Sequence, residues 1–345
     1  MEGGHQKLER YSRQILFEGI GEEGQRKLQT KHVLIVGAGA LGTGNAEVLT
    51  RSGVGRITIV DRDYVERSNL QRQQLYTERD AIDRIPKAIA AQKRLREINP
   101  TVEVNGKIVD VTVEEIDQLV SDVDLVIDAT DNFDIRFLIN DSAQKHRIPW
   151  IYGGCVSSYG LSFTIIPGET PCLNCLLETI PLGGATCDTV GVISPAVQMV
   201  VAYQTVEAMK ILVEDFESVR WKLVSFDLWN NEQSAIDVSG LKKKDCPSCG
   251  ESPSYPYLSY ENQTKTAVLC GRNTVQIRPP KKVDRDLHVL VTQLEKQGGN
   301  IEQNPFLVTY HYEDRRVVFF KDGRVLIHGM KDIVEAKKIY HQLLG

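Results

Sequence analysis

A glycine-rich turn that follows an apolar run is the feature that most limits how this chain can fold. The run Val33–Val36 leads directly into Gly-Ala-Gly-Ala-Leu-Gly at residues 37–42, and a stretch with helical composition follows. Gly37 and Gly39 allow a tight turn and let backbone N–H groups approach an anion, while Gly42 lets the helix pack closely on the strand. The partial positive charge of the helix N-terminus adds to this attraction. The pattern predicts a strand, a turn and a helix that hold a phosphate group.

An acidic residue stands where nucleotide-binding folds of this kind place one. Asp61 closes the next apolar strand, Ile57–Val60, nineteen residues after Gly42, at the position that binds ribose hydroxyls in dinucleotide folds. The glycine motif and this acid are compatible with NAD and with ATP, so they do not distinguish between the two ligands. Arg72 and Lys87 favour ATP, because a triphosphate under attack needs cations on its β and γ groups. Either residue taken singly would be interpreted as a solvated surface charge.

Asp131 is the candidate ligand for a magnesium ion. It follows the run Asp124–Asp128, so we expect it at the carboxyl end of a buried parallel strand, where open α/β sheets bind their ligands. Mg²⁺ is usually held by one or two carboxylates together with phosphate oxygens and water. The alternative is that Asp131 or Asn132 only caps the helix expected over Phe133–Lys145. The two roles are compatible on neighbouring residues.

Four cysteines form two Cys-x-x-Cys pairs, which is the spacing of a tetrahedral zinc site. Cys172 and Cys175 make the first pair, and Cys246 and Cys249 the second, with seventy residues between the pairs. A thioredoxin-type redox pair would need only one of them. We therefore expect one structural zinc ion, and a closed four-thiolate site leaves no coordination position for catalysis.

The other three cysteines give weaker signals. Cys187 lies in a glycine-rich stretch, residues 183–189, that we expect to be an exposed loop, where a reactive thiolate would have to lie. A bystander thiol is an equally good interpretation of it. Cys155 and Cys270 resemble small buried hydrophobic residues, which free cysteines most often are.

The order of apolar runs predicts an α/β chain of two domains. Residues 1–252 are expected to form a doubly wound, Rossmann-like ATP-binding domain that antiparallel strands continue, and residues 253–345 a small α/β domain. In the first domain we expect strands at Val33–Val36, Arg56–Asp61, Val102–Lys107, Leu125–Asp128, Trp150–Tyr152 and Gly160–Ile166, and helices at Leu8–Glu18, Glu22–Gln29, Ala40–Thr50, Ile85–Ile98, Val113–Val120, Phe133–Lys145 and Ala196–Val213. In the second we expect two short strands, helix Arg285–Gln297, strands Phe306–Tyr310, Arg316–Phe320 and Val325–His328, and helix Ile333–Leu344.

The composition limits the partners and the cellular compartment that we expect for this chain. The net charge of −5 argues against nucleic acid as the general partner. Seven cysteines, four of them in zinc pairs, favour a reducing compartment over a disulfide framework. The first residues lack the apolar core of a signal peptide, and no stretch is expected to span a membrane. We therefore expect a cytoplasmic protein.

Together these motifs resemble the bacterial MoeB/ThiF/HesA group of ubiquitin-activating-enzyme-like adenylyltransferases, over about residues 8 to 250. The motifs that carry the resemblance are the glycine turn, Asp61, and the segments Arg10–Gln14, Ser68–Gln73, Pro86–Lys87 and Ala129–Asn132. Enzymes of this group use ATP and Mg²⁺ to adenylate the C-terminal glycine of a small ubiquitin-fold sulfur carrier, in molybdopterin or thiazole synthesis. The resemblance implies such a carrier, of the MoaD or ThiS type and ending in Gly-Gly, as partner. It also implies a homodimer, and a sulfurtransferase or cysteine desulfurase as a further partner.

The resemblance also implies a role for single residues. Asp61 would bind the ribose, and Asn69, Arg72, Gln73 and Lys87 would contact the nucleotide and its phosphates. Asp131 would act near the metal, the zinc would use the four cysteines named above, and Cys187 could take up the activated carrier or a sulfur atom. Arg13 would reach into the ATP site of the neighbouring subunit, although a charge on a helix surface is an equal alternative.

Other functions remain open at this point. An NAD-dependent oxidoreductase would share the glycine turn and Asp61 but would leave Asn69, Arg72 and Lys87 without a purpose. A related adenylyltransferase could act on a tRNA base or a peptide, because the ATP half does not report the acceptor. An inactive nucleotide-binding module is the third alternative. The reaction itself needs no histidine, because the carboxylate of the carrier is already a nucleophile.

Overall fold

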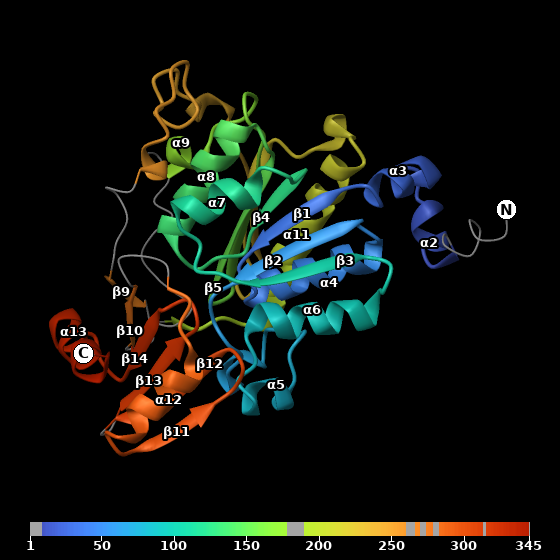
Figure 1. Ribbon diagram of the computed structural model, residues 1–345. Coiled ribbons are helices and arrows are strands. Elements are labelled where there is room, and N and C mark those ends of the chain that lie inside the picture. The colour runs from blue at the N-terminus through green and yellow to red at the C-terminus, as the bar shows by residue number, and fades with distance from the viewer. Residues whose placement is uncertain are drawn as a thin grey trace. The chain divides into compact units, whose positions relative to one another are not determined.

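The first unit of the chain is built on one sheet, whose strands lie in the order β3-β2-β1-β4-β5-β6-β7-β8 (Figure 1). The computed structural model describes residues 9–177, 190–259, 266–269, 274–278, 283–312 and 315–344. These residues form two compact units, the first holding most of the chain up to residue 259 and the second holding residues 190–191 and the chain from 266 onward. The strands of the first unit are β1 His32–Val36, β2 Arg56–Asp61, β3 Glu103–Ile108, β4 Leu125–Asp128, β5 Trp150–Val156, β6 Tyr159–Ile165, β7 Lys222–Asp227 and β8 Glu232–Asp237.

The strand register creates a reversal point beside β1. β1 pairs in parallel with β2 and β4, so that Val36 lies between Val60 on one side and Asp128 on the other. The chain continues from β1 to β2 and β3 in one direction and returns to β4 in the other. Ligands of open α/β sheets bind outside the carboxyl ends of the strands at such a reversal. The expected fold class, including the antiparallel strands from β6 onward, is confirmed.

Helices cover both faces of this sheet, because successive residues of a strand point to opposite faces. Val33 and Ile35 pack into the core with α4, α6 and α11, whereas Leu34 and Val36 pack into the core with α7 and α8. The helices of this unit are α2 Ser12–Ile15, α3 Gly21–Leu28, α4 Ala40–Ser52, α5 Glu78–Ile82, α6 Lys87–Ile98, α7 Val113–Val120, α8 Phe133–His146, α9 Leu173–Leu177 and α11 Ser194–Leu212, with 3-10 turns η1 Arg67–Asn69, η2 Phe216–Ser218, η3 Ser239–Leu241 and η4 Pro256–Leu258.

Two helices begin later or end earlier than the sequence predicts. The helix expected over Leu8–Glu18 is interrupted by a turn at Arg10 and Tyr11, and α2 spans only Ser12–Ile15. The chain turns again after Phe17, with Gly21 at a φ of +59°. The helix expected from Ile85 begins at Lys87, since Pro86 has an extended backbone and precedes the first turn.

The second unit is a separate α/β body. Its six antiparallel strands lie in the order β11-β12-β13-β14-β10-β9. Its helices, α12 Leu287–Glu295 and α13 Ile333–Leu344, bury leucine and isoleucine side chains against one face of the sheet. The strands are β9 Thr266–Leu269, β10 Thr274–Ile277, β11 Asn300–Gln303, β12 Leu307–Tyr312, β13 Arg315–Phe320 and β14 Val325–His328. α12 begins two residues after the predicted Arg285, because the side chain of Asp286 caps it by accepting from the N–H groups of His288 and Val289.

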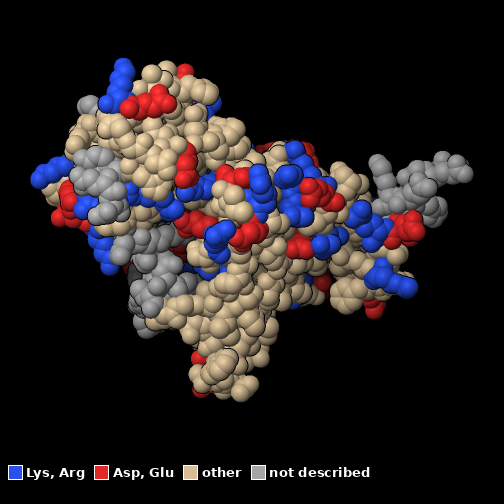
Figure 2. All heavy atoms as spheres, turned by 90° about the horizontal axis from the view of Figure 1, so that it is seen from below, with Lys and Arg blue, Asp and Glu red and all other residues tan. Residues whose placement is uncertain are grey.

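The charges on the surface and the character of the helices bear on what the molecule can bind or cross. Lys and Arg side chains are interspersed with Asp and Glu on the face drawn in Figure 2. Among the described helices, none combines the length and the apolar character that a bilayer crossing requires.

Candidate nucleotide site and cysteine cluster

The surroundings of the three glycines of the turn differ, and they show why each position has no side chain. Gly37 has a φ of +99°, and a Cβ on it would lie 2.5 Å from the carbonyl oxygen of Ala129. A Cβ on Gly42 would lie 1.9 Å from the carbonyl oxygen of Gly37. A Cβ on Gly39, in contrast, would meet nothing nearer than Nε2 of Gln73 at 3.9 Å. Protein packing thus requires the first two glycines, while Gly39 leaves a space that a ligand can use.

Helix α4 begins beside this space. Gly39 is the N-cap residue of α4, and no side chain among the described residues caps the helix there. The first N–H groups of a helix have no partner within it and attract anions. The turn can therefore hold a phosphate group.

Asp61 is tied to the turn by its carboxylate. Oδ2 accepts a hydrogen bond of 2.7 Å from the N–H of Ala38, and Oδ1 accepts one of 2.7 Å from the N–H of Asp63. Burial raises the pKa of Asp61, and the nearby Lys87 opposes this shift. A carboxylate has about four acceptor positions, so Asp61 can still accept hydrogen bonds from ribose hydroxyls.

Two cations accompany these acids at the end of β2. Lys87 is 3% exposed, and its Nζ lies 3.5 Å from Oδ2 of Asp63. Nη1 of Arg62 lies 3.1 Å from Oδ1 of Asp110. Burial opposes the charge of Arg62, but Asp110, Asp63 and Asp131 together outweigh it and raise its pKa. Arg62 therefore stays charged, and it lies with Lys87 where a polyphosphate would need cations.

The segment after β2 brings Gln73 to the turn and also carries Asn69 and Arg72. Gln73 is 3% exposed, and its Oε1 has no hydrogen-bond partner among the described residues. Asn69 is buried and its Oδ1 accepts from the N–H of Glu66, which fixes the η1 turn. Nη1 of Arg72 donates to the carbonyl of Ser68 within the same turn. This buried oxygen, on the side chain nearest Gly39, is an available ligand contact.

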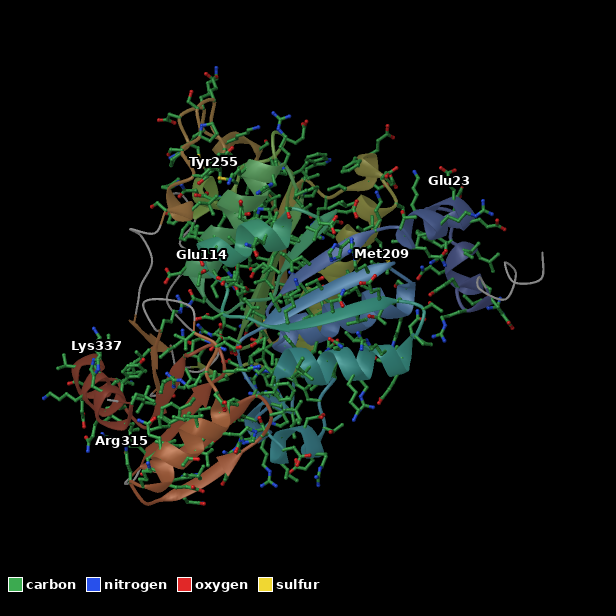
Figure 3. All side chains as sticks on the ribbon, viewed as in Figure 1. Glu23, Glu114, Met209, Tyr255, Arg315 and Lys337 are labelled. Carbon is green, nitrogen blue, oxygen red and sulfur yellow. The ribbon has the colours of Figure 1, made fainter. Side chains whose placement is uncertain are left out.

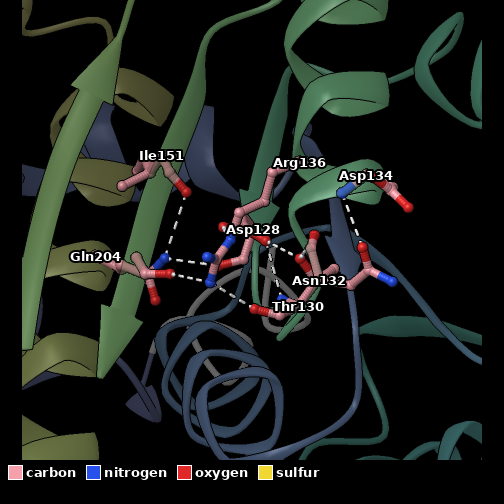
Figure 4. Close-up of polar contacts among 8 residues, drawn as sticks. Asp128, Thr130, Asn132, Asp134, Arg136, Ile151 and Gln204 are labelled. Atoms are coloured by element: carbon pink, nitrogen blue, oxygen red, sulfur yellow. Dashed lines mark hydrogen bonds and ion pairs between the residues drawn. The ribbon is translucent and has the colours of Figure 1, made fainter. Parts of the chain in front are cut away.

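A buried ion pair holds the loop that carries Asp131 (Figure 4). Asp128 is 0% exposed, and its Oδ2 accepts a hydrogen bond of 3.0 Å from Nε of Arg136. Its Oδ1 accepts from the N–H and the hydroxyl of Thr130, at 2.9 and 2.7 Å. Nη2 of Arg136 donates to the carbonyls of Thr130 and Gly153, at 2.7 and 3.3 Å. These contacts fix the backbone on both sides of Asp131.

The competing interpretation of Asp131 as a helix cap is resolved. Asn132 is the N-cap of α8, and its side chain accepts a hydrogen bond of 2.8 Å from the N–H of Asp134. Asp131 itself is exposed at the carboxyl end of β4. It is close enough to Arg62 and Arg136 to raise the pKa of each. An exposed carboxylate in this place can bind a metal ion that also contacts phosphate.

Arg13 lies far from the nucleotide-site residues of its own chain. α2 lies beside α3 at one end of the first unit (Figure 1), where Nε2 of Gln14 donates to the carbonyl of Ser52 at 3.0 Å. Ser52 ends α4, and the glycine turn begins it. A helix of 13 residues is about 20 Å long, so the exposed Arg13 and the glycine turn lie at opposite ends of α4.

The four predicted zinc ligands come together. The Sγ atoms of Cys172, Cys175, Cys246 and Cys249 all lie within 4.8 Å of one another, with separations of 3.9, 3.7 and 3.6 Å for the three pairs Cys172–Cys175, Cys172–Cys246 and Cys175–Cys249. Tetrahedral zinc with Zn–S bonds of about 2.3 Å places its sulfur ligands about 3.8 Å apart. The donor set and spacing fit a closed zinc site.

The surrounding structure fixes both cysteine pairs. A Cβ on Gly250 would lie 2.4 Å from the carbonyl oxygen of Lys244, so only glycine fits the second turn. Tyr255, labelled in Figure 3, donates its N–H to the carbonyl of Pro247 at 3.1 Å. The N–H of Leu173 donates to Oδ1 of Asn140 in α8 at 2.9 Å. α8 thus connects the cysteine cluster to the Asp131 loop.

Of the remaining three cysteines, the structure describes only one. Cys187 and Cys270 lie outside the described residues, so a chemical role for Cys187 stays a prediction. Cys155 is half-buried and packs against the core of the first unit.

Sequence reasoning missed several residues of this site. Arg62 and Asp63 follow Asp61 directly, and that adjacency was the available signal. Tyr76, whose hydroxyl contacts the carbonyls of Ala38 and Lys87, and the pair Asp128–Arg136 carried no such signal, because their partners are distant in the sequence or become buried only in the fold.

The sequence is similar to known proteins over nearly its whole length. The sequence profile of the ThiF family matches residues 11–248. The sulfur carrier protein ThiS adenylyltransferase of Bacillus subtilis is 55% identical over 337 residues, which are 97% of this chain and 99% of that protein. The ThiS adenylyltransferase of Escherichia coli is 36% identical over 248 residues, 72% of this chain and 97% of that protein. Among solved structures, E. coli MccB with ATP shares the fold with a TM-score of 0.61, at 22% identity over 70% of this chain and 74% of MccB.

Proposed function

Because the chain belongs to the ThiF family, as its motifs predicted, we propose that it uses ATP to adenylate the C-terminal glycine of a ubiquitin-fold sulfur carrier of the ThiS type. Two similar proteins named as ThiS adenylyltransferases support this choice of carrier. A carrier of the ThiS type places the reaction in thiazole rather than molybdopterin synthesis.

The open space at Gly39 is the observation that carries the proposal. Gly37 and Gly42 are explained by close backbone contacts, but a side chain on Gly39 would enter only the space beside Gln73. The same space borders a helix start without a side-chain cap. A site for the phosphates of a nucleotide accounts for all three features.

The chemistry needs positioning and charge stabilisation more than acid–base catalysis. A carboxylate oxygen of the carrier attacks the α-phosphorus, the bond to the β-phosphate breaks, and pyrophosphate leaves with the electron pair. The carboxylate is already ionised near neutral pH, so no general base is required. Lys87, Arg62 and Arg72 would stabilise the charge that develops on the leaving pyrophosphate.

The other residues take the remaining roles in this proposal. Asp61 accepts the ribose hydroxyls, and the amide side chains of Asn69 and Gln73 contact the nucleotide. Asp131 holds Mg²⁺, which when bound neutralises part of the phosphate charge. The Asn132 cap and the Asp128 ion pair hold the backbone on both sides of Asp131 at the end of β4.

Arg13 acts in this proposal from the second subunit of a homodimer. The length of α4 separates it from the glycine turn of its own chain. The exposed side chains of Leu16 and Phe17, 74% and 66% exposed, lie beside it and give α2 an apolar surface that a second copy can cover.

We assign zinc to the four-cysteine cluster, with a structural role. Four buried or half-buried sulfur atoms at the right mutual distances leave no ligand position open. The metal would fix α8 through the hydrogen bond between Leu173 and Asn140.

Exposed aromatic residues lie near the edge of the sheet where β4 ends and the nucleotide is proposed to bind. They favour a protein as the acceptor of the adenylate. The β5–β6 hairpin continues beyond the end of β4, and Tyr159 pairs there with Asp227, next to the β7–β8 turn. Tyr159 is 38% exposed and Trp229, in that turn, 78% exposed. The side chain of Asp227 fixes the turn by accepting from the N–H of Trp229. Trp229→Ala should raise the KM for the carrier and leave the KM for ATP unchanged.

The direct test is exchange of labelled pyrophosphate into ATP in the presence of Mg²⁺ and candidate acceptors. We expect exchange with a ThiS-type carrier that ends in Gly-Gly and none with the same carrier lacking its terminal glycine. A MoaD-type carrier and a short peptide test the other acceptors. Exchange that is independent of the carrier, or NAD binding tighter than ATP, would contradict the proposal.

A further inference from the structure

Five residues around the glycine turn form a closed ring of hydrogen bonds. The N–H of Ala38 donates to Oδ2 of Asp61 at 2.7 Å, and Oδ1 of Asp61 accepts from the N–H of Asp63 at 2.7 Å. The carbonyl of Asp63 accepts from the N–H of Lys87 at 2.9 Å. The hydroxyl of Tyr76 reaches the carbonyls of Lys87 and Ala38, at 3.1 and 2.6 Å, and closes the ring.

The ring joins three elements that each supply a group to the nucleotide site. Ala38 belongs to the glycine turn, Asp61 ends β2, and Lys87 begins α6. Tyr76 is the member whose side chain bonds the other two backbone segments, because its hydroxyl contacts both carbonyls. A hydroxyl has a single proton, and the shorter distance assigns it mainly to Ala38.

Tyr76 stays a donor in this position. The side chain is 7% exposed and packs in the core of the first unit. Burial, together with the carboxylates of Asp61, Asp80 and Asp63, raises its pKa well above the usual value. The phenol therefore keeps its proton at any pH at which the enzyme works.

We propose that Tyr76 is a positioning residue that aligns the glycine turn with Lys87 for the phosphates of ATP. This inference rests on the proposed function only in taking ATP as the ligand. Without the hydroxyl, the carbonyl of Ala38 loses a buried donor, and the start of α6 is tied to the turn only through Asp61 and Asp63. The N–H groups of the turn and Nζ of Lys87 then no longer meet the phosphates in one fixed geometry.

Tyr76→Phe isolates the hydroxyl, because phenylalanine keeps the aromatic ring that packs in the core. Tyr310→Phe is the matched control. Tyr310 is 2% exposed, its hydroxyl also donates to a backbone carbonyl, that of Gly298, and it belongs to the second unit. Both variants keep the aromatic ring and lose a hydroxyl that bonds a backbone carbonyl, so their stability should change to a similar extent.

Calorimetry with a non-hydrolysable ATP analogue and Mg²⁺ tests the inference. Loss of a buried hydrogen bond to a carbonyl should weaken binding by Tyr76→Phe about tenfold, while Tyr310→Phe binds like the wild type. In the exchange assay the KM for ATP should rise and the KM for the carrier should stay constant. Hydrogen exchange at the amides of Ala38 and Lys87 should become faster in Tyr76→Phe only.

The outcomes separate this inference from the proposed function. Equal affinity of Tyr76→Phe and wild type for the analogue would overturn the positioning role, even if the variant is less stable. Failure of the wild type to bind ATP would instead overturn the proposed function. A rise in KM for the carrier without a change for ATP would also overturn the inference.

Discussion

Replacement of Arg136 by methionine tests how the Asp131 loop is held. Methionine keeps most of the apolar stem of arginine but removes its charge and its donors. Oδ2 of Asp128 loses its partner at 0% exposure, and the carbonyls of Thr130 and Gly153 lose theirs. Removing one partner of a buried ion pair costs about 3–5 kcal/mol. For a unit of this size that lowers Tm by about 6–20 °C.

The loss should depend on pH in a defined direction. Burial raises the pKa of Asp128, and Arg136 opposes this shift. Without Arg136 the pKa of Asp128 rises further above that of the unfolded chain, so the folded variant binds a proton that the unfolded chain releases. The free energy of unfolding of the variant therefore increases relative to wild type as the pH falls. The deficit should be smaller at about pH 5 than at about pH 8.

Urea unfolding followed by circular dichroism measures these differences. The double variant Asp128→Asn/Arg136→Met should recover much of the loss, because no unpaired charge remains buried. Arg26→Met is the control, since the pair Arg26–Glu22 has side chains 68% and 64% exposed and contributes at most about 0.5 kcal/mol. A loss for Arg136→Met no larger than that of the control, or a deficit that grows in acid, would refute the reasoning.

Three further changes test other parts of the site. Asp131→Asn should lower kcat by about a hundredfold or more without lowering Tm, because the carboxylate is exposed and caps no helix; near-normal turnover would place the metal elsewhere. Metal analysis of reduced, freshly purified protein should find one zinc ion per chain, and Cys249→Ser should lose the ion together with stability, since a structural zinc site contributes folding energy; metal-free wild type would contradict this. Inactive Arg13→Ala and Asp131→Ala chains, mixed under verified subunit exchange, should regain part of the activity, because each heterodimer then has one intact site; a mixture that stays inactive would exclude the shared site.

The sequence predicted those parts of the fold that local patterns determine. The central parallel strands β1, β2 and β4 contain short apolar runs, which are typical of strands buried on both faces. The glycine turn and the two cysteine pairs have fixed spacings, and the structure brings the four sulfur atoms together as expected. β8 could not be predicted in this way, because all six of its residues are exposed. A strand exposed on both faces has no alternation of apolar and polar residues in its sequence.

The polar connections of the site could not be derived in the same way. Asp128 and Arg136 are eight residues apart, and charged residues are usually exposed; only the fold makes them a buried pair. Tyr76 contacts a carbonyl 38 residues earlier in the chain, and no spacing rule connects the two. The contact of Arg72 with the phosphates stays a prediction, and in the structure its Nη1 donates to the carbonyl of Ser68.

Transfer of the α-phosphate of ATP is the most direct test of the central claim. ATP labelled at the α-phosphate should give a labelled carrier with AMP on its terminal glycine, detectable by mass spectrometry, whereas ATP labelled at the γ-phosphate should give only labelled pyrophosphate. A carrier lacking the terminal glycine should stay unlabelled. Label from the γ-phosphate on the carrier, or no label from either nucleotide in the presence of Mg²⁺, would contradict the account.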